Sequence, residues 1–178
     1  MPWQRDLIFD AARRYTSTFE PDMLTAAPTR GIVILTCMDA RLDLFRMLGL
    51  EVGDSHILRN AGGRATDDAI RSLMLSAHWL GTREFAVIHH TGCGLFGVTN
   101  EEIATKVQSA TGIRPDIDFL PFDDIEASVR GDVERIRRCA ALPRDSVVWG
   151  AIYDVHNGCL LPIDLPVPIT GAVEPMVR

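Results

Sequence analysis

The chain has 178 residues, of which 47% are hydrophobic and 24% are charged, and its formal net charge is -6. This length favours one domain with a sizeable core, so we expect a single domain over residues 1–178. The acidic balance excludes the basic surface that nucleic acids or anionic membranes require, and no apolar run approaches the ~20 residues that span a bilayer. The N-terminal segment lacks the apolar stretch of a signal peptide, so we expect a cytoplasmic protein.

Helix and strand patterns alternate along the sequence. Apolar residues at helical spacing predict an amphipathic N-terminal helix over 3–19, which could pack on its own domain or on a second subunit. Short runs rich in β-branched residues predict buried strands, and a hairpin signal at 156–158 precedes the last of them; they lie at 31–35, 55–59, 85–89, 146–153 and 160–163. Further helices are predicted between these strands, at 42–48, 66–80, 99–112 and 122–141.

This alternation predicts the fold class. Helices that connect buried strands imply right-handed crossovers and parallel pairing. The final hairpin adds an antiparallel strand at one edge, and we expect the tail from Pro166 to lie over the surface. The sequence therefore predicts an α/β fold with a central, mainly parallel sheet of four strands plus an antiparallel edge strand, flanked by helices.

Two short motifs follow predicted strands and carry metal-ligand side chains. Cys37 and Asp39 follow the first strand, whereas His89 ends the third strand and His90 and Cys93 follow it. The carboxyl ends of parallel strands meet at one edge of a sheet, where ligands bind in α/β folds. Two thiolates, an imidazole and a carboxylate form a tetrahedral set for Zn²⁺. Neighbouring strand residues face opposite ways, so we choose His90 as the ligand and expect His89 to hydrogen-bond in the core or at an interface.

Arg41 distinguishes this zinc hypothesis from a simpler one. Cys37 and Cys93 could be buried apolar residues, because the chain has none of the paired Cys-x-x-Cys elements common in structural zinc sites. However, Asp39 and Arg41 can form a bidentate ion pair that holds the carboxylate away from the metal. The fourth zinc position is then free for water, which ionises near pH 7 on zinc.

The motif Cys37-x-Asp39-x-Arg41, followed by His90-x-x-Cys93-Gly94, resembles the β-class carbonic anhydrase family. The segment Arg59-Asn60-Ala61-Gly62-Gly63 also resembles that family's loop between the two motifs, and the resemblance spans roughly residues 30–160. It implies a central four-stranded parallel sheet extended by a fifth strand, and one Zn²⁺ held by Cys37, His90 and Cys93. It also implies a homodimer or a multiple of it, with the N-terminal helix embracing the partner.

The same resemblance implies an activity. In it, zinc-bound hydroxide attacks CO₂ to give bicarbonate, and Arg41 orients Asp39, which accepts a hydrogen bond from the hydroxide. In a closed state Asp39 would instead take the fourth zinc position. The implied substrate pocket comprises Asn60, Ala61, Gly62, Gly63, Gly94 and Leu95.

Some positions depart from the family's common pattern. Ala40 stands where many members have Ser, and His89 and Leu95 stand where many have Gly. These features resemble a small bacterial subgroup to which carbonyl sulfide hydrolases are also similar. Hydrolysis of carbonyl sulfide or carbon disulfide at the same zinc site, releasing H₂S, is therefore the alternative activity. A zinc-stabilised binding protein without turnover is a third hypothesis, and the Asp39–Arg41 pair argues against it.

Other side chains could serve the site, but each has a simpler explanation. Together with Leu95, three further apolar residues could line an entrance to the site: Phe45, Met47 and Phe96. Ordinary packing in the hydrophobic core would explain each of them equally well. Three isolated histidines could shuttle protons, although surface or satisfied core histidines are more common: His56, His78 and His156. A helix N-terminus explains Asp67 and Asp68, and Cys139 and Cys159 are expected to be structural thiols.

Overall fold

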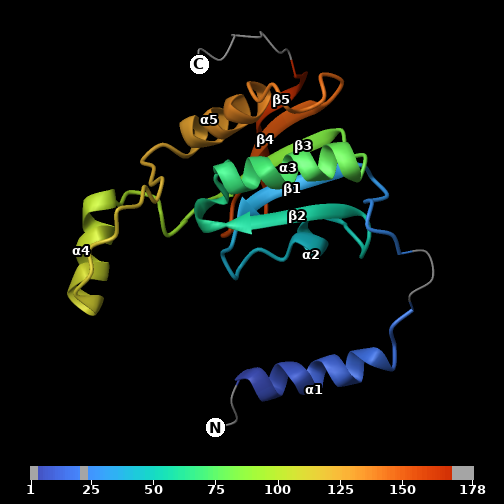
Figure 1. Ribbon diagram of the computed structural model, residues 1–178, viewed down its shortest axis with the longest axis horizontal. Coiled ribbons are helices and arrows are strands. Elements are labelled where there is room, and N and C mark those ends of the chain that lie inside the picture. Colours follow the sequence, from blue (N-terminus) through green and yellow to red (C-terminus); the bar gives the residue numbers. More distant parts are fainter. Residues whose placement is uncertain (1–3, 21–23, 170–178) are drawn as a thin grey trace.

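A computed structural model describes residues 4–20 and 24–169 of the chain (Figure 1). The described helices are α1 (Gln4–Thr16), α2 (Leu44–Leu48), α3 (Asp67–Trp79), α4 (Asn100–Thr111), α5 (Ile125–Arg137) and the 3₁₀ turn η1 (Ala61–Gly63). The strands are β1 (Ile32–Cys37), β2 (Ser55–Asn60), β3 (Glu84–His90), β4 (Val147–Tyr153) and β5 (Leu160–Pro168). Within the described ranges, no helix combines the length and apolar character needed to cross a membrane.

All five strands form one sheet in the order β2-β1-β3-β4-β5. Strands β2, β1, β3 and β4 pair in parallel, and β5 pairs antiparallel with β4 at the edge. The predicted fold class is therefore confirmed. Because β1 and β3 are adjacent and parallel, their carboxyl ends, which carry the two motifs, lie side by side.

Helices cover the two faces of the sheet unequally. One face packs under α3 and α5, and its core includes Val33, Leu73, Phe85, Val133 and Val148. The opposite face has a smaller apolar cluster around Ile34, Ala86 and Ile88, against which residues of α2 pack. Strands β1 and β3 are thus covered on both faces, which explains their nearly uninterrupted apolar sequences.

Helix boundaries follow the capping residues in most places. The left-handed Gly49 ends α2, and the side chain of Thr66 accepts a hydrogen bond from the amide of Ala69 at the start of α3. Thr99 and Glu102 form a reciprocal capping box at α4.

The prediction was wrong at three boundaries. The helix predicted over 122–141 spans only Ile125–Arg137, because Asp124 caps its first turn and Phe122 is engaged with the loop at Leu95. The last strand continues to Pro168, so the residues from 166 to 168 belong to the sheet rather than to a surface tail. The N-terminal helix ends at Thr16, before the predicted limit of 19. Residue 3 and the tail from 170 onward lie outside the described residues.

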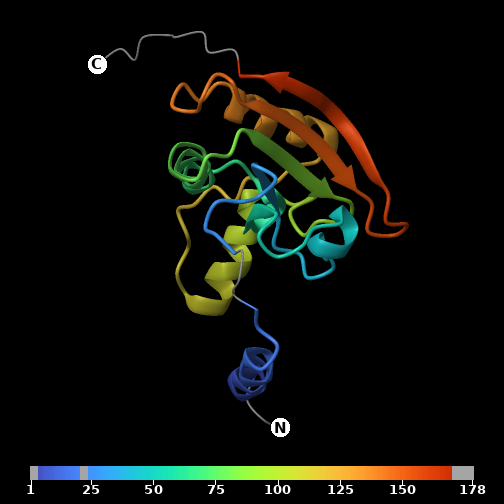
Figure 2. The same cartoon turned by 90° about the vertical axis from the view of Figure 1, so that its right-hand side faces the viewer.

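Helix α1 stands apart from the rest of the chain. Figures 1 and 2 both show it separated from the sheet, and none of its residues is buried. A single helix of 13 residues is marginally stable in water, so most helices of this length depend on packing of an apolar face.

Candidate active site

Three metal-ligand side chains meet at the carboxyl edge of the sheet. Cys37 ends β1, His90 ends β3, and Cys93 lies in the loop after β3. All three are buried, and their donor atoms lie within 4.8 Å of one another. The two Sγ atoms are 3.9 Å apart, close to the ~3.8 Å expected for two thiolates bound tetrahedrally to one zinc ion at about 2.3 Å.

The environment of His90 leaves one ring nitrogen available to a metal. Its Nδ1 lies 3.0 Å from the carbonyl oxygen of Thr91, to which it can donate its proton. Its Nε2 is buried and has no hydrogen-bond partner among the described residues. A backbone carbonyl that fixes one nitrogen as the donor leaves the other with its lone pair free, as in metal-bound histidines. The cluster therefore fits Zn²⁺.

His89 points to the other side of β3, as the alternation along a strand requires. Its side chain is fully buried, and its Nε2 lies 3.2 Å from a carboxylate oxygen of Asp132 on α5. His89 is therefore part of the core between the sheet and α5 and does not join the metal cluster.

The two thiols influence each other's ionisation. Without a metal, the contact with Cys93 is the main cause that lowers the pKa of Cys37 to about 4, against the opposing effect of burial. The same contact, together with burial, raises the pKa of Cys93. The contact therefore favours ionisation of one sulfur and opposes ionisation of the other. Zinc binding must displace the thiol protons, because thiolates are the ligand form.

Arg41 holds Asp39 beside this cluster. The guanidinium donates from Nε to Oδ1 at 2.9 Å and from Nη2 to Oδ2 at 2.7 Å, and the Arg41 amide also donates to Oδ1 at 2.9 Å. Nη2 is anchored in turn on the carbonyl of Gly92 at 2.8 Å. These bonds hold the pKa of the Asp39 carboxyl well below its usual range, and Oδ2 lies 3.8 Å from Nε2 of His90.

A cavity of ≈ 580 Å³ opens in front of the cluster. It is lined by Cys37, Met38, Asp39, Ala40, Ala61, Gly62, Cys93, Gly94 and Leu95. Asp39 supplies the one carboxylate of this lining, and most of the remaining wall is apolar. Of the predicted pocket residues, four lie in the lining, whereas Asn60 and Gly63 do not.

Asn60 and Gly63 support the pocket from behind. The Asn60 side chain bonds both the amide and the carbonyl of Arg64, at 2.8 and 2.7 Å, and so closes the 60–64 loop. Gly63 has φ +70°, and a Cβ there would lie 2.9 Å from the backbone nitrogen of Cys37. Only glycine lets this loop approach the ligand strand so closely.

Arg59 is a site residue whose role the sequence did not reveal. Its guanidinium donates to the carbonyls of Cys37, Leu42 and Asp39, at 2.9, 3.4 and 2.5 Å. It thereby secures the loop that carries a zinc ligand and the Asp39 carboxylate. The available signal was an arginine directly after the apolar pair Ile57 and Leu58.

The remaining candidates lie away from the cavity or are engaged elsewhere. Phe45 lines a separate hollow beside β2, and Phe96 contacts the ring of Phe122. Met47 belongs to α2 and packs into the core, against the apolar cluster around Ile34 and against the cluster that contains Cys37 and Cys93. Both ring nitrogens of His56 and one of His78 have hydrogen-bond partners, whereas His156 is exposed in the hairpin. Asp67 and Asp68 pair with arginines, Cys139 is half-buried and Cys159 is exposed.

Comparison with known proteins agrees with this geometry. Residues 32–118 match the family model described as carbonic anhydrase. The chain is 40% identical over 146 residues to β-carbonic anhydrase 1 of Mycobacterium bovis, covering 82% of this chain and 89% of the relative. It is 36% identical over 154 residues to a carbon disulfide hydrolase of Acidianus, covering 72% and 74%.

Among solved structures, the carbonic anhydrase from Streptococcus mutans superimposes with a TM-score of 0.88 at 42% identity, covering 92% of this chain and 99% of that one. Sequence and structure agree over nearly the whole length of both chains. The Cys-His-Cys cluster is the donor set that a zinc enzyme of this kind requires. The chain therefore belongs to the β-carbonic anhydrase family of zinc enzymes.

Proposed function

We propose that this protein is a zinc-dependent carbonic anhydrase that interconverts CO₂ and bicarbonate. The placement of Asp39 carries the proposal: Arg41 holds both carboxylate oxygens, and Oδ2 lies 3.8 Å from Nε2 of His90. A structural zinc site closes with four protein ligands, whereas a catalytic site has three and keeps the fourth position open. An arginine-held carboxylate next to a three-ligand cluster matches the catalytic arrangement.

Each residue has a separate task in this proposal. The side chains of Cys37, His90 and Cys93 would hold the ion, which lowers the pKa of water to about 7 and so supplies a nucleophile at neutral pH. Asp39 is ionised and can therefore only accept hydrogen bonds, so it orients the proton of the reacting water toward itself. Arg41 keeps Asp39 in that orientation.

The cavity wall suits an apolar reactant. Ala40, Ala61 and Leu95 present hydrocarbon beside the cluster, and Asp39 is the charged side chain among the lining residues. A small linear molecule without charge, such as CO₂, gains from this surface, whereas the charged product bicarbonate does not. The wall therefore favours substrate entry and product release.

Hydrolysis of carbon disulfide or carbonyl sulfide is the second candidate. These molecules are linear and apolar like CO₂, and carbon disulfide hydrolases are among the relatives. We favour the carbonic anhydrase because the Mycobacterium and Streptococcus proteins match 82% and 92% of this chain, whereas the carbon disulfide hydrolase with the higher identity, 51%, matches only 57% of it.

A paired assay on the zinc-loaded protein tests the proposal. One arm follows CO₂ hydration by stopped-flow pH indicator, and the other follows H₂S release from carbonyl sulfide and carbon disulfide. We expect fast hydration with trace H₂S, and loss of most of the rate in Asp39→Asn at unchanged zinc content. Efficient H₂S release with feeble hydration would make the second candidate correct. A protein inactive in both arms with zinc bound would overturn both.

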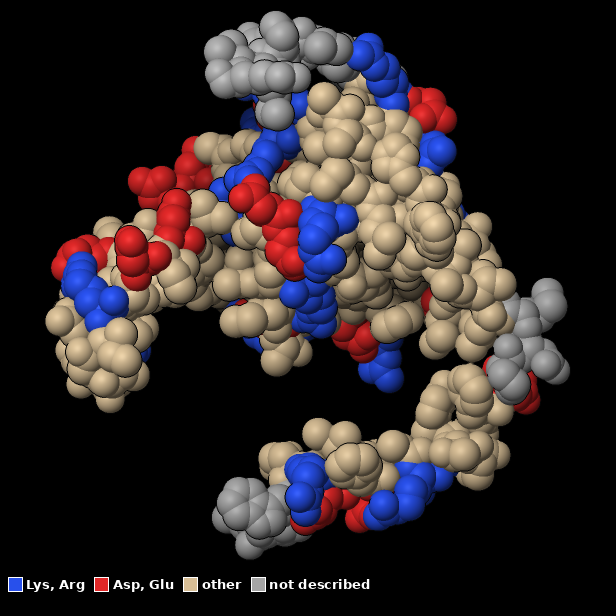
Figure 3. All heavy atoms as spheres, in the orientation of Figure 1, with Lys and Arg blue, Asp and Glu red and all other residues tan. Residues whose placement is uncertain are grey.

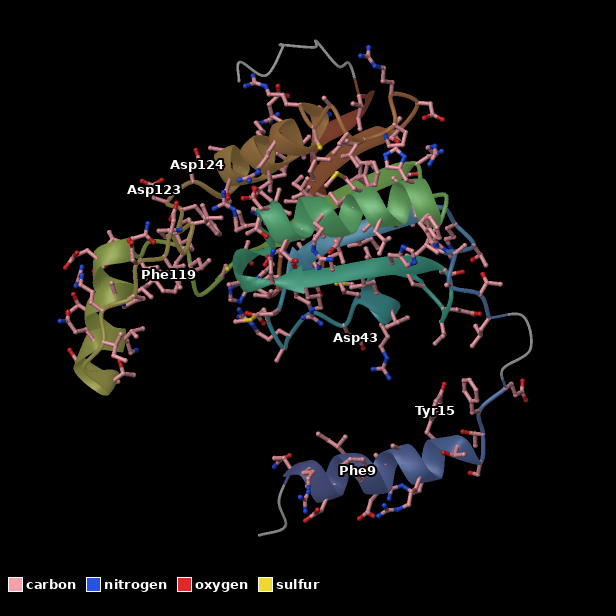
Figure 4. All side chains as sticks on the ribbon, viewed as in Figure 1. Phe9, Tyr15, Asp43, Phe119, Asp123 and Asp124 are labelled. Carbon is pink, nitrogen blue, oxygen red and sulfur yellow. The ribbon has the colours of Figure 1, made fainter. Side chains whose placement is uncertain are left out.

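We also infer that α1 packs on a second copy of the chain. Its apolar side chains Leu7, Ile8 and Tyr15 are between 46% and 65% exposed. Figure 3 shows charged residues along the lower edge of α1, and Figure 4 shows Tyr15 pointing into the space between α1 and the sheet. A second chain could fill that space and give the homodimer expected from the sequence. The single-domain organisation and the cytoplasmic location stay predictions.

A further inference from the structure

A buried ion pair lies behind the cavity and takes no part in the chemistry described above. Nε of Arg64 donates to Oδ2 of Asp132 at 2.7 Å, and the two side chains are 14% and 5% exposed. Oδ1 of Asp132 accepts from the amide of Ala65 at 3.1 Å, and His89 faces Oδ2 at 3.2 Å. Because of the cost of desolvation, a buried ion pair adds little net stability to a fold. The presence of this pair is therefore better explained by a role other than stability.

Arg64 anchors the first wall of the cavity, the loop that contains Ala61 and Gly62, through its backbone. It follows directly on Gly62 and Gly63, and both of its backbone polar groups are bonded to the side chain of Asn60. The Asp132 carboxylate bonds the Arg64 side chain and the next amide in the chain. Helix α5 therefore fixes the end of the loop whose residues Ala61 and Gly62 line the cavity.

Arg64 anchors the second wall of the cavity, the loop that contains Leu95, through its side chain. Its Nη1 donates to the carbonyl of Leu120, which has φ 56°, a conformation that leucine rarely adopts. Its guanidinium lies over the Phe122 ring at 5.7 Å. The Phe122 amide in turn donates to the carbonyl of Leu95 at 3.1 Å, and the Gly97 amide donates to the carbonyl of Phe122 at 2.8 Å. The loop that presents Leu95 to the cavity is thus attached to Arg64.

The two walls meet where Gly62 faces Leu95. A Cβ on Gly62 would lie 2.9 Å from Cδ1 of Leu95, so the glycine backbone and the leucine side chain are already in contact. A small displacement of either loop changes the width of the cavity at this point. Of the cavity's lining residues, these two come from different loops that share Arg64 as an anchor.

We propose that Arg64 and Asp132 are positioning residues that fix the separation of Gly62 and Leu95 and thereby limit the width of the linear substrate that the cavity admits. Sulfur is larger than oxygen, so a fixed narrow wall discriminates against carbon disulfide, and a loosened wall admits it. The discrimination between substrates rests on the proposed function, because it concerns which linear molecule reaches the zinc site. The attachment of the two loops to Arg64 does not depend on the proposed function.

The test compares Asp132→Asn and Arg64→Lys with two controls. Val133→Ala removes buried volume from the same helix without touching a polar contact of the pair, and Asp68→Asn removes a carboxylate from an exposed ion pair. At matched zinc content, we expect the ratio of kcat/KM for carbon disulfide to that for CO₂ to rise about tenfold in both pair variants. In both controls the ratio should stay within about twofold of the wild type.

Amide hydrogen exchange gives a readout that does not depend on activity. Loss of the pair should speed exchange at the amides of Arg64, Ala65, Gly97 and Phe122, whereas Val133→Ala should leave these amides protected relative to the rest of the chain. Leu95→Ala, which removes the wall directly, should raise the ratio even if a pair variant does not fold.

The outcomes separate the two proposals. A wild type that turns over neither substrate would end the proposed function, and the exchange data would still judge the attachment of the walls. An unchanged substrate ratio and unchanged exchange in folded Asp132→Asn would overturn the positioning role. So would a ratio that rises equally in Val133→Ala, because loss of stability alone would then explain it.

Discussion

The sulfur atoms of Cys37 and Cys93 lie 3.9 Å apart, although 56 positions separate the two residues in the chain. A zinc ion between them and His90 joins the end of β1 to the loop after β3, so binding of the metal also stabilises the fold. Replacing Cys37 by Ser should remove most of the zinc and lower the Tm. It should also abolish the decrease in Tm that a chelator causes in the wild type.

Metal analysis and thermal denaturation with and without chelator check this prediction. Cys159→Ser is the matched control, because that cysteine is exposed in the hairpin and is not one of the three clustered metal-ligand residues. It should keep one zinc per chain and the wild-type Tm. Full zinc occupancy in Cys37→Ser would refute the ligand assignment.

Arg41→Lys should reduce kcat/KM for CO₂ by about a hundredfold with zinc retained. An ammonium group cannot bind both carboxylate oxygens as the guanidinium does, so Asp39 loses its fixed orientation. Arg46→Lys, in the exposed pair with Asp43 on α2, should have the wild-type rate.

The pH dependence of kcat/KM shows whether Arg41→Lys acts by misorienting the Asp39 carboxylate or by changing its ionisation. Arg41 keeps the pKa of Asp39 well below its usual range, and loss of the contact moves this pKa upward toward about 3.9. Asp39 is then still ionised between about pH 6 and 9, so the amplitude of the profile should fall without a shift in its midpoint. A shift of the midpoint toward higher pH would instead indicate that Asp39 changes its charge or binds the metal.

Asp132→Asn should destabilise the protein at neutral pH by about 3 kcal/mol, because it leaves the buried Arg64 cation without its counterion. Burial acts to raise the pKa of Asp132, but the contact with His89 and the hydrogen bond from Arg64 outweigh it, so the pKa in the folded state is lowered. A lowered carboxyl pKa contributes stability above the unfolded-state value of about 3.9, and this stability is lost as the pH falls through the folded value.

The difference between the wild-type and Asp132→Asn unfolding free energies should therefore be largest near neutrality and shrink below about pH 4. Urea denaturation of both proteins across this pH range measures it. Acid release of zinc occurs in both proteins and largely cancels in the difference. A difference that is independent of pH would show that Asp132 is not ionised in the fold.

Ile8→Glu should shift the protein from dimer to monomer and reduce its helical content. Ile8 lies on the apolar side of α1 and is 65% exposed within one chain, so a carboxylate there affects only packing against another molecule. Arg13→Gln changes the charge by the same amount on the opposite side of the helix and should preserve the dimer. Sedimentation equilibrium and circular dichroism provide the measurements. A wild type that is monomeric at micromolar concentration would contradict the inference about α1.

The sequence by itself determined the strands and most of the helices, because their signals are local. Apolar β-branched runs gave β1 and β3, and Thr66 and Gly49 marked helix ends through their own backbone and side-chain chemistry. The zinc cluster was also accessible, since Cys37 and His90 end strands that are parallel neighbours. The boundary of α5 was misplaced because Phe122 pairs with a loop distant in sequence, and periodicity carries no record of such a contact.

Only the tertiary structure revealed the contacts that support the site from the side opposite the cavity. That Arg59 binds three carbonyls, and that Arg64 and Asp132 meet 68 residues apart, depends on how β2, η1 and α5 come together. In the sequence, Arg59 ends a predicted strand and Arg64 stands in a loop, and neither position indicates these partners. Packing of the sheet against its helices determines which partners these side chains meet. Ordering the side chains costs conformational entropy, and burial of the hydrophobic core offsets this cost, whereas local sequence preference does not.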